Sequence, residues 1–67
     1  MVTRVEADKR VLKWARERIR LSVERAAALL KCKPNILQRI EDGEVAPNAT
    51  LFRRMASVYL LPEATLL

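Results

Sequence analysis

Apolar residues recur every three or four positions along most of the chain, which is the period of an amphipathic helix. Over residues 9–19 this spacing places Leu12, Ala15 and Ile19 on one face, with basic residues mostly opposite. Asp8 precedes the segment, and an aspartate there can accept hydrogen bonds from the free backbone N–H groups of a first turn. The pattern therefore predicts a first helix with Asp8 as its N-cap.

The second apolar segment is short, and the side chains on its inner face are small. Ser22 stands just before it, in the place of a helix N-cap. Three consecutive alanines, 26–28, give high helix propensity and allow another helix to approach closely. We expect a second helix whose inner face consists of Val23, Ala26, Ala27 and Leu30.

A third helix is predicted over residues 34–42. Pro34 suits a first helical turn, where its missing N–H is not needed, and Leu37 and Ile40 form an inward face. Gly43 is the single glycine of the chain and stands where a left-handed residue ends a helix. Because only three residues separate this helix from the one before, we expect the two to cross steeply.

The remaining chain predicts a fourth helix and a fragment of a fifth. Asn48 can cap the fourth, and Pro62 begins a new turn that residues 63–67 continue. Residues 2–6 form the only stretch with a tendency to be extended. We therefore expect an all-α bundle of four helices plus a short fifth, forming one domain over residues 1–67. The inner face of the fourth helix is predicted to hold Leu51, Met55, Val58 and Tyr59, with Phe52 on its flank.

Composition removes several function classes. A chain of 67 residues hides only about 60% of its unfolded surface, so a buried catalytic cleft is hard to fit. There is no His and a single Cys, Cys32, which removes most zinc sites, histidine-based catalysis and an intrachain disulfide. We expect no catalytic residue, no metal and no cofactor. No apolar stretch is long enough for a membrane span or a signal peptide, so we expect a cytoplasmic protein.

Positive charge is concentrated in the first half of the chain. The net charge is +5, but residues 1–34 hold ten basic and four acidic side chains, whereas residues 35–67 hold three and four. Such an imbalance indicates a polyanionic partner, although a solvated charged surface that keeps a small protein soluble explains it equally well. Charge alone therefore leaves both interpretations open.

Two runs resemble the helix-turn-helix of the Cro and lambda-repressor-like class, often called the XRE family. They are Leu21-Ser22-Val23-Glu24-x-Ala26-Ala27-x-Leu29-Leu30 and Pro34-Asn35-Ile36-Leu37-Gln38-Arg39-Ile40-Glu41-x-Gly43-Glu44-x-x-Pro47. The flanking segments 12–18 and 51–62 are similar to the DNA-binding domain in front of ImmA/IrrE-type metallopeptidases and in related antitoxin regulators. The resemblance covers nearly the whole chain.

This resemblance implies a transcriptional regulator that binds double-stranded DNA, commonly as a homodimer, with the third helix in the major groove. Asn35 and Gln38 have the paired donor and acceptor that match adenine, and Arg39 can reach guanine or a phosphate. It further implies a structural ion pair between Arg16 and Glu41. The implied DNA-binding residues are Ser22, Val23, Lys33, Pro34, Asn35, Ile36, Gln38 and Arg39, among which Ile36 would contact a thymine methyl and Lys33 a phosphate.

The chain departs from the family pattern at four positions. Val23 replaces the usual Gln, so one expected contact is missing. Lys31 stands where a small residue or Gly is usual, and must adopt a turn conformation that Gly would adopt with less strain. Lys33 replaces a hydroxyl N-cap, and Glu44 stands where a basic residue commonly meets phosphate. Val23 and Glu44 favour the alternative that this is a protein-interaction module, which docks a toxin, a peptidase domain or another regulator.

Other residues have simpler explanations. We expect Trp14 in the core, Cys32 at a buried site in the turn, and Asp42 as a surface charge. Ser22 has no base to activate it as a nucleophile, because the chain has no His. The C-terminal leucines, Leu60, Leu61, Leu66 and Leu67, are expected to leave apolar surface that either a second copy or a following domain covers.

Overall fold

A computed structural model describes residues 5–67, and this part of the chain consists of helices joined by short turns. The helices are α1 (Lys9–Arg18), α2 (Val23–Leu30), α3 (Pro34–Glu41), α4 (Ala49–Tyr59) and α5 (Glu63–Leu66). The prediction of an all-α bundle with four helices and a short fifth is confirmed. The segment expected to be extended lies partly outside the described residues; at its end, the backbone N–H of Val5 donates to the carbonyl of Pro47 at 2.8 Å.

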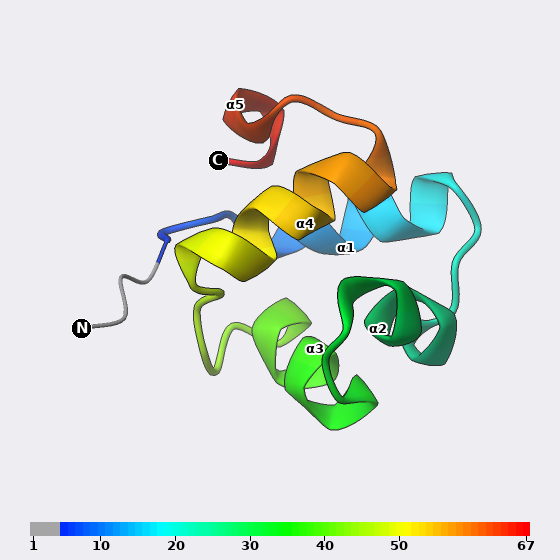
Figure 1. Cartoon of the computed structure of the whole chain (residues 1–67). Helices are drawn as coiled ribbons and strands as arrows, with labels where there is room; N and C mark the ends of the chain where they lie inside the picture. The colour runs from blue at the N-terminus through cyan, green and yellow to red at the C-terminus, as the bar shows by residue number, and fades with distance from the viewer. Residues whose placement is uncertain (1–4) are drawn as a thin grey trace.

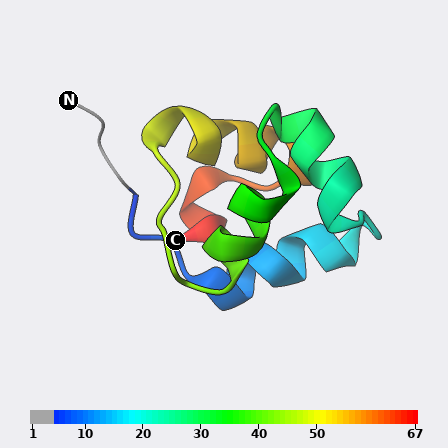
Figure 2. The same ribbon diagram turned by 90° about the horizontal axis from the view of Figure 1, so that it is seen from below.

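The helices surround one core from four sides. Figure 1 shows α4 crossing in front of α1, with α2 and α3 below them and α5 above. Seen from below in Figure 2, α1 and α4 lie at opposite edges of the domain, with α3 toward the viewer. The helix-turn-helix formed by α2 and α3 and the C-terminal helix α5 therefore lie at opposite ends of the molecule.

Most of the predicted inward residues form the core, but Ile19, Val23, Leu51 and Val58 are only half-buried, and Ala56 is buried. Phe52 is 3% exposed and belongs to the core, so its placement on the flank of α4 was wrong. Leu66 is fully buried and anchors α5. The buried apolar side chains are Leu12, Ala15, Ala26, Ala27, Leu30, Leu37, Ile40, Phe52, Met55, Ala56, Tyr59 and Leu66.

Three helices begin with the predicted side-chain caps. Asp8 accepts from the N–H of Arg10 at 2.9 Å, and Ser22 accepts from the N–H of Arg25 at 3.1 Å. Asn48 caps α4 by accepting from the N–H of Leu51 at 2.8 Å. The backbone hydrogen bond from Arg10 also lowers the pKa of Asp8, because it stabilises the carboxylate. By contrast, Lys33 at the start of α3 makes no capping hydrogen bond.

Four helices end in one recurring arrangement, the Schellman motif, in which a left-handed residue turns the chain away from the helix axis. The left-handed residues are Arg20, Lys31, Gly43 and Leu60, with φ between 58° and 81°. In each case the next residue donates its N–H to the carbonyl five positions earlier, at 2.9–3.3 Å. After α1, α2 and α4 this next residue packs against the core; it is Leu21, Cys32 and Leu61, respectively. After α3 it is Glu44, which is exposed.

Trp14 is 52% exposed, so the expectation that it belongs to the core was wrong. Leu12 and Ala15 lie on the side of α1 that faces the core. Trp14 is two positions after Leu12 and therefore lies more than half a helical turn around the axis from it. The Arg18 guanidinium covers the Trp14 ring with its central carbon 5.7 Å from the ring centroid, and it also donates to the carbonyl of Tyr59. The outer side of α1 is thereby tied to the end of α4.

The C-terminal leucines are only partly exposed. Leu66 is buried and Leu61 packs against the core, whereas Leu60 and Leu67 are 79% and 61% exposed. The expectation that all four leucines form an uncovered apolar surface was therefore wrong for two of them. Short helix α5 accounts for this difference, because it turns Leu66 back into the bundle.

Candidate nucleic-acid interface

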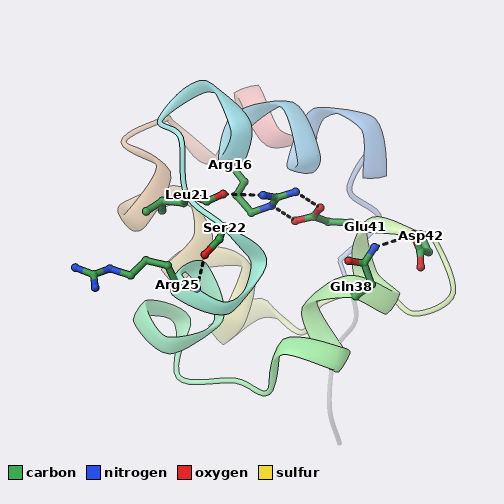
Figure 3. A network of polar contacts seen from close by, with 7 residues as sticks. All are labelled: Arg16, Leu21, Ser22, Arg25, Gln38, Glu41 and Asp42. Atoms are coloured by element: carbon green, nitrogen blue, oxygen red, sulfur yellow. Dashed lines mark hydrogen bonds and ion pairs between the residues drawn. The ribbon is translucent and has the colours of Figure 1, made fainter.

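A buried ion pair fixes the position of α3 against α1. The Arg16 guanidinium donates from Nε to Oε2 of Glu41 at 2.7 Å and from Nη2 to Oε1 at 2.9 Å. Its third nitrogen, Nη1, donates to the backbone carbonyl of Leu21 at 2.6 Å (Figure 3). Because Leu21 directly precedes the N-cap of α2, one side chain joins α1, the start of α2 and the last turn of α3.

The chemistry of this contact suits a buried site. The side chains of Arg16 and Glu41 are only 10% and 1% exposed, so each needs a partner to offset the loss of water. The two-pronged contact satisfies both carboxylate oxygens, and the hydrogen bond with Glu41 raises the pKa of Arg16. The resemblance implied this pair, and the structure brings its members together in that form.

The outer side of α3 is polar and accessible. Its first residues Pro34 and Asn35 are exposed, as are Gln38 and Arg39 one turn further on. Leu37, Ile40 and Glu41 occupy the opposite side of the helix and are buried. Positions 35, 38 and 39 share one face by helical spacing, so the three side chains with base-matching chemistry lie together.

The remaining residues expected at the interface differ in exposure. Lys33 and Ser22 are exposed, whereas Ile36 and Val23 are half-buried and pack against the core. The hydroxyl of Ser22 accepts a hydrogen bond at the start of α2, as Figure 3 shows, which gives it a capping role in the protein alone. Lys31 and Lys33 flank the turn between the two helices and are both exposed, so they place positive charge beside α3.

Two acidic residues contact the base-matching side chains. Nε2 of Gln38 donates to Oδ1 of Asp42 at 3.1 Å, and Nε of Arg39 donates to Oε2 of Glu44 at 3.2 Å. Neither contact was predicted, since Asp42 was expected to be a surface charge and Glu44 a residue unfavourable for phosphate binding. The first was detectable from its spacing of four within a helix. The second spans the end of α3 and depends on the turn at Gly43.

Two further titratable groups lie near the helix-turn-helix: the hydroxyl of Tyr59, which is buried, and the thiol of Cys32, which is only half-buried and not buried as expected. Burial raises the pKa of the Cys32 thiol, which disfavours the reactive thiolate. Burial also raises the pKa of Tyr59, whose hydroxyl has no hydrogen-bond partner among the described residues. Within residues 5–67, no group of three or more His, Cys, Asp or Glu side chains is arranged to hold a metal ion.

A family model described as a helix-turn-helix domain matches residues 10–67, and the chain belongs to this family. The comparisons with curated proteins and with solved structures found no match. The family, together with the exposed polar face of α3, indicates a DNA-binding regulator. None of the helices within residues 5–67 is long and apolar enough to cross a membrane.

Proposed function

We propose that this protein is a sequence-specific transcriptional regulator, of repressor or antitoxin-like type, that inserts α3 into the major groove of double-stranded DNA. The observation that carries the proposal is the exposed face formed by Asn35, Gln38 and Arg39 on a helix held from behind by the Arg16–Glu41 pair. A fixed helix that presents amide and guanidinium groups has the chemistry and the rigidity that base recognition needs.

The proposed roles follow from the chemistry of each side chain. Asn35 and Gln38 address adenine, Arg39 addresses guanine, and Ile36 contacts a thymine methyl at the edge of the groove. Lys33 meets a phosphate, and Ser22 and Val23 at the start of α2 lie against the sugar-phosphate backbone, with Pro34 at the tip of α3. The protein acts in the cytoplasm without enzymatic activity, metal or cofactor.

We further propose that two copies bind one operator, because a single domain with one short reading helix covers only a half-site. The domain of residues 1–67 acts alone or as the N-terminal part of a longer protein, as its similarity to the front domain of ImmA/IrrE-type regulators supports. Leu60 and Leu67, which follow α4 and α5, are exposed, and α5 lies at the end of the molecule opposite α3. A second copy or a following domain bound there leaves α3 free for DNA.

The first test is selection from a random duplex library at near-physiological salt, followed by sequencing of the bound DNA. An enriched palindrome with half-sites about one helical turn apart is the expected result. Gln38→Ala and Arg39→Ala should then cost roughly 1–3 kcal/mol of binding to that site and relax the preference at one base pair each. Lys33→Ala should weaken binding to all sequences alike.

A matched control is Arg53→Ala, which removes one positive charge from an exposed position on α4. It should leave the sequence preference unchanged, whereas Arg39→Ala should not. If the folded protein enriches no sequence, or if Gln38→Ala leaves the preferred sequence intact, the assignment of α3 as the reading helix is wrong.

The alternative function is protein docking, and the exposure of Trp14, Leu60 and Leu67 favours it. Salt separates the two functions. Binding through phosphate contacts falls steeply between low and physiological salt, because counterions are released from DNA. Binding through an apolar surface changes little over the same range, so a salt-insensitive complex would favour the docking function.

A further inference from the structure

Gln38 and Arg39, near the middle of α3, each donate a hydrogen bond to a carboxylate that follows the last residue of this helix. We infer that Glu44 and Asp42 are positioning residues that fix the orientation in which Arg39 and Gln38 meet the bases, and so sharpen sequence preference. This inference rests on the proposed function and goes beyond it, because that function gives no role in base recognition to Asp42 or Glu44.

The backbone places Glu44 beside Arg39 before their side chains interact. The N–H of Glu44 donates to the carbonyl of Arg39 itself at 2.9 Å, and the N–H of Gly43 donates to the carbonyl of Ile40 at 3.1 Å. These two bonds require the left-handed conformation of Gly43, whose φ is 81°. The contact between the two side chains is therefore built on a fixed turn.

The Arg39–Glu44 contact leaves the reading end of Arg39 free. Glu44 accepts from Nε, at 3.2 Å, which is the nitrogen nearest the aliphatic stem. The two terminal nitrogens carry the other four N–H groups, and a pair of these is what guanine O6 and N7 accept. A guanidinium bonded at Nε loses rotational freedom before it reaches DNA, so less freedom is lost on binding.

Asp42 acts on Gln38 in a related way. A carboxylate only accepts hydrogen bonds, so the 3.1 Å contact requires the amide nitrogen of Gln38 and not its oxygen. The amide orientation is thereby set, and the oxygen and the second N–H remain for adenine, which offers one donor and one acceptor. Both Gln38 and Asp42 are exposed, so the contact lies where DNA would approach.

The end of α3 also differs from the other helix ends in a way that supports this role. After α1, α2 and α4 the residue that follows the left-handed position is Leu21, Cys32 or Leu61, and each packs against the core. At the corresponding position after α3, Glu44 is exposed, with 58% of its side chain accessible. The position that packs against the core after the other three helices is thus occupied after α3 by a carboxylate that accepts a hydrogen bond from Arg39.

The test compares base preference among variants. Library selection with the wild type and with Arg39→Ala identifies the base pair that Arg39 reads. Glu44→Ala should then reduce the preference at that base pair by roughly fivefold or more, while the base pair read by Gln38 is unaffected. Binding to unrelated DNA should stay equal or increase, because one negative charge is removed.

Conservative variants separate positioning from charge. Glu44→Gln keeps an oxygen that can accept from Nε, so it should retain most of the preference that Glu44→Ala loses. Asp42→Ala and Asp42→Asn form the corresponding pair for the base pair read by Gln38. In the double variant Arg39→Ala and Glu44→Ala, the base preference should equal that of Arg39→Ala alone, because Glu44 acts through Arg39.

The control is Glu63→Ala, which removes a negative charge from an exposed position on α5, at the other end of the molecule, and should leave both preferences intact. Thermal unfolding by circular dichroism should show near-native stability for all these variants, since the contacts are exposed. If Glu44→Ala keeps the full wild-type preference at the Arg39 base pair, or loses preference evenly at all base pairs, the inference is wrong, whereas the proposed function still holds. A wild-type protein that selects no sequence overturns the proposed function together with it.

Discussion

The two helices of the helix-turn-helix have the same length, eight residues each, but are secured at opposite ends. α2 begins with the capping hydroxyl of Ser22 and ends at Lys31, a non-glycine residue in the left-handed region. The N-cap of α3 is Lys33, which makes no capping hydrogen bond, and after its C-cap Asp42 comes Gly43, which adopts the left-handed conformation without strain. The favourable local feature of α2 is therefore the cap at its start, and that of α3 is the glycine after its end.

The charges at the two C-terminal ends differ as well. The last turn of α3 and the residues after it carry Glu41, Asp42 and Glu44, whereas no acidic residue occupies the corresponding part of α2. Negative charge at a helix C-terminus is unfavourable, because the helix dipole is negative there. Each of the three carboxylates has a separate partner that offsets this cost, namely Arg16, Gln38 and Arg39. The comparison shows that the end of α3 is organised by polar contacts and the end of α2 by apolar packing.

The strongest way to break this arrangement is Glu41→Ala. It leaves the Arg16 guanidinium buried without its carboxylate, which should lower the free energy of unfolding by about 3–5 kcal/mol, a large part of the stability of a small domain. Urea unfolding followed by circular dichroism measures the loss. Glu44→Ala is the matched control, since its ion pair with Arg39 is exposed and should contribute less than about 1 kcal/mol. Equal losses in the two variants would show that the buried pair does not anchor α3.

The left-handed residues at the two helix ends should respond in opposite directions. Gly43→Ala places a side chain in a left-handed conformation and brings its Cβ to 2.7 Å from Cδ of Lys9, which must move. A cost of about 1–2 kcal/mol is expected from the backbone strain. Lys31→Gly relieves the same strain at the end of α2, and should raise the free energy of unfolding by about 0.5–1 kcal/mol after the added flexibility of glycine is subtracted.

Thermal and urea unfolding of both variants test this pair. A loss of stability in Lys31→Gly would mean that the side chain of Lys31 contributes more than its conformation costs. No loss in Gly43→Ala would mean that the turn after α3 can relax, which would also weaken the argument that it fixes Glu44 beside Arg39.

The smallest expected effect concerns the start of α3. Lys33→Ser introduces the hydroxyl cap that α2 has in Ser22, and should raise the free energy of unfolding by about 0.5–1 kcal/mol. The same change removes a positive charge from the proposed DNA-binding face, so binding should weaken and its dependence on salt should become less steep by about one counterion. Lys33→Ala, which removes the charge without adding a cap, is the control for stability. A stabilised variant with unchanged DNA binding would show that Lys33 meets no phosphate.

The helices were predictable because several independent sequence signals agree on where each helix begins and ends. Caps at Asp8, Ser22 and Asn48, the proline that begins α3 and the glycine that ends it all agree with the apolar period. Trp14 was misplaced because its size favours burial, and only its angular position on α1 opposes that. Phe52 was misplaced because it lies at the edge of the apolar face of α4. A residue at such an edge is buried or exposed according to what packs beside it.

The candidate interface was predictable as a set of positions but not as a set of contacts. A resemblance between sequences places Gln38 and Arg39 on a reading helix, yet it does not say which neighbours hold them. Gln38 and Asp42 share a helical face, so their contact follows from spacing. Glu44 lies beyond the end of α3, and its approach to Arg39 depends on the backbone turn that the left-handed Gly43 produces. Such contacts across a helix end require the path of the chain and not only its period.

Because Trp14 is exposed on the surface, its intrinsic fluorescence can report binding to the protein. It is the only tryptophan in the chain, and it lies half in water beneath the guanidinium of Arg18. Its fluorescence therefore reports the outer surface of α1 and the junction with α4, and responds weakly to events in the core. A partner that covers this side would change the emission of the tryptophan directly, without any attached dye.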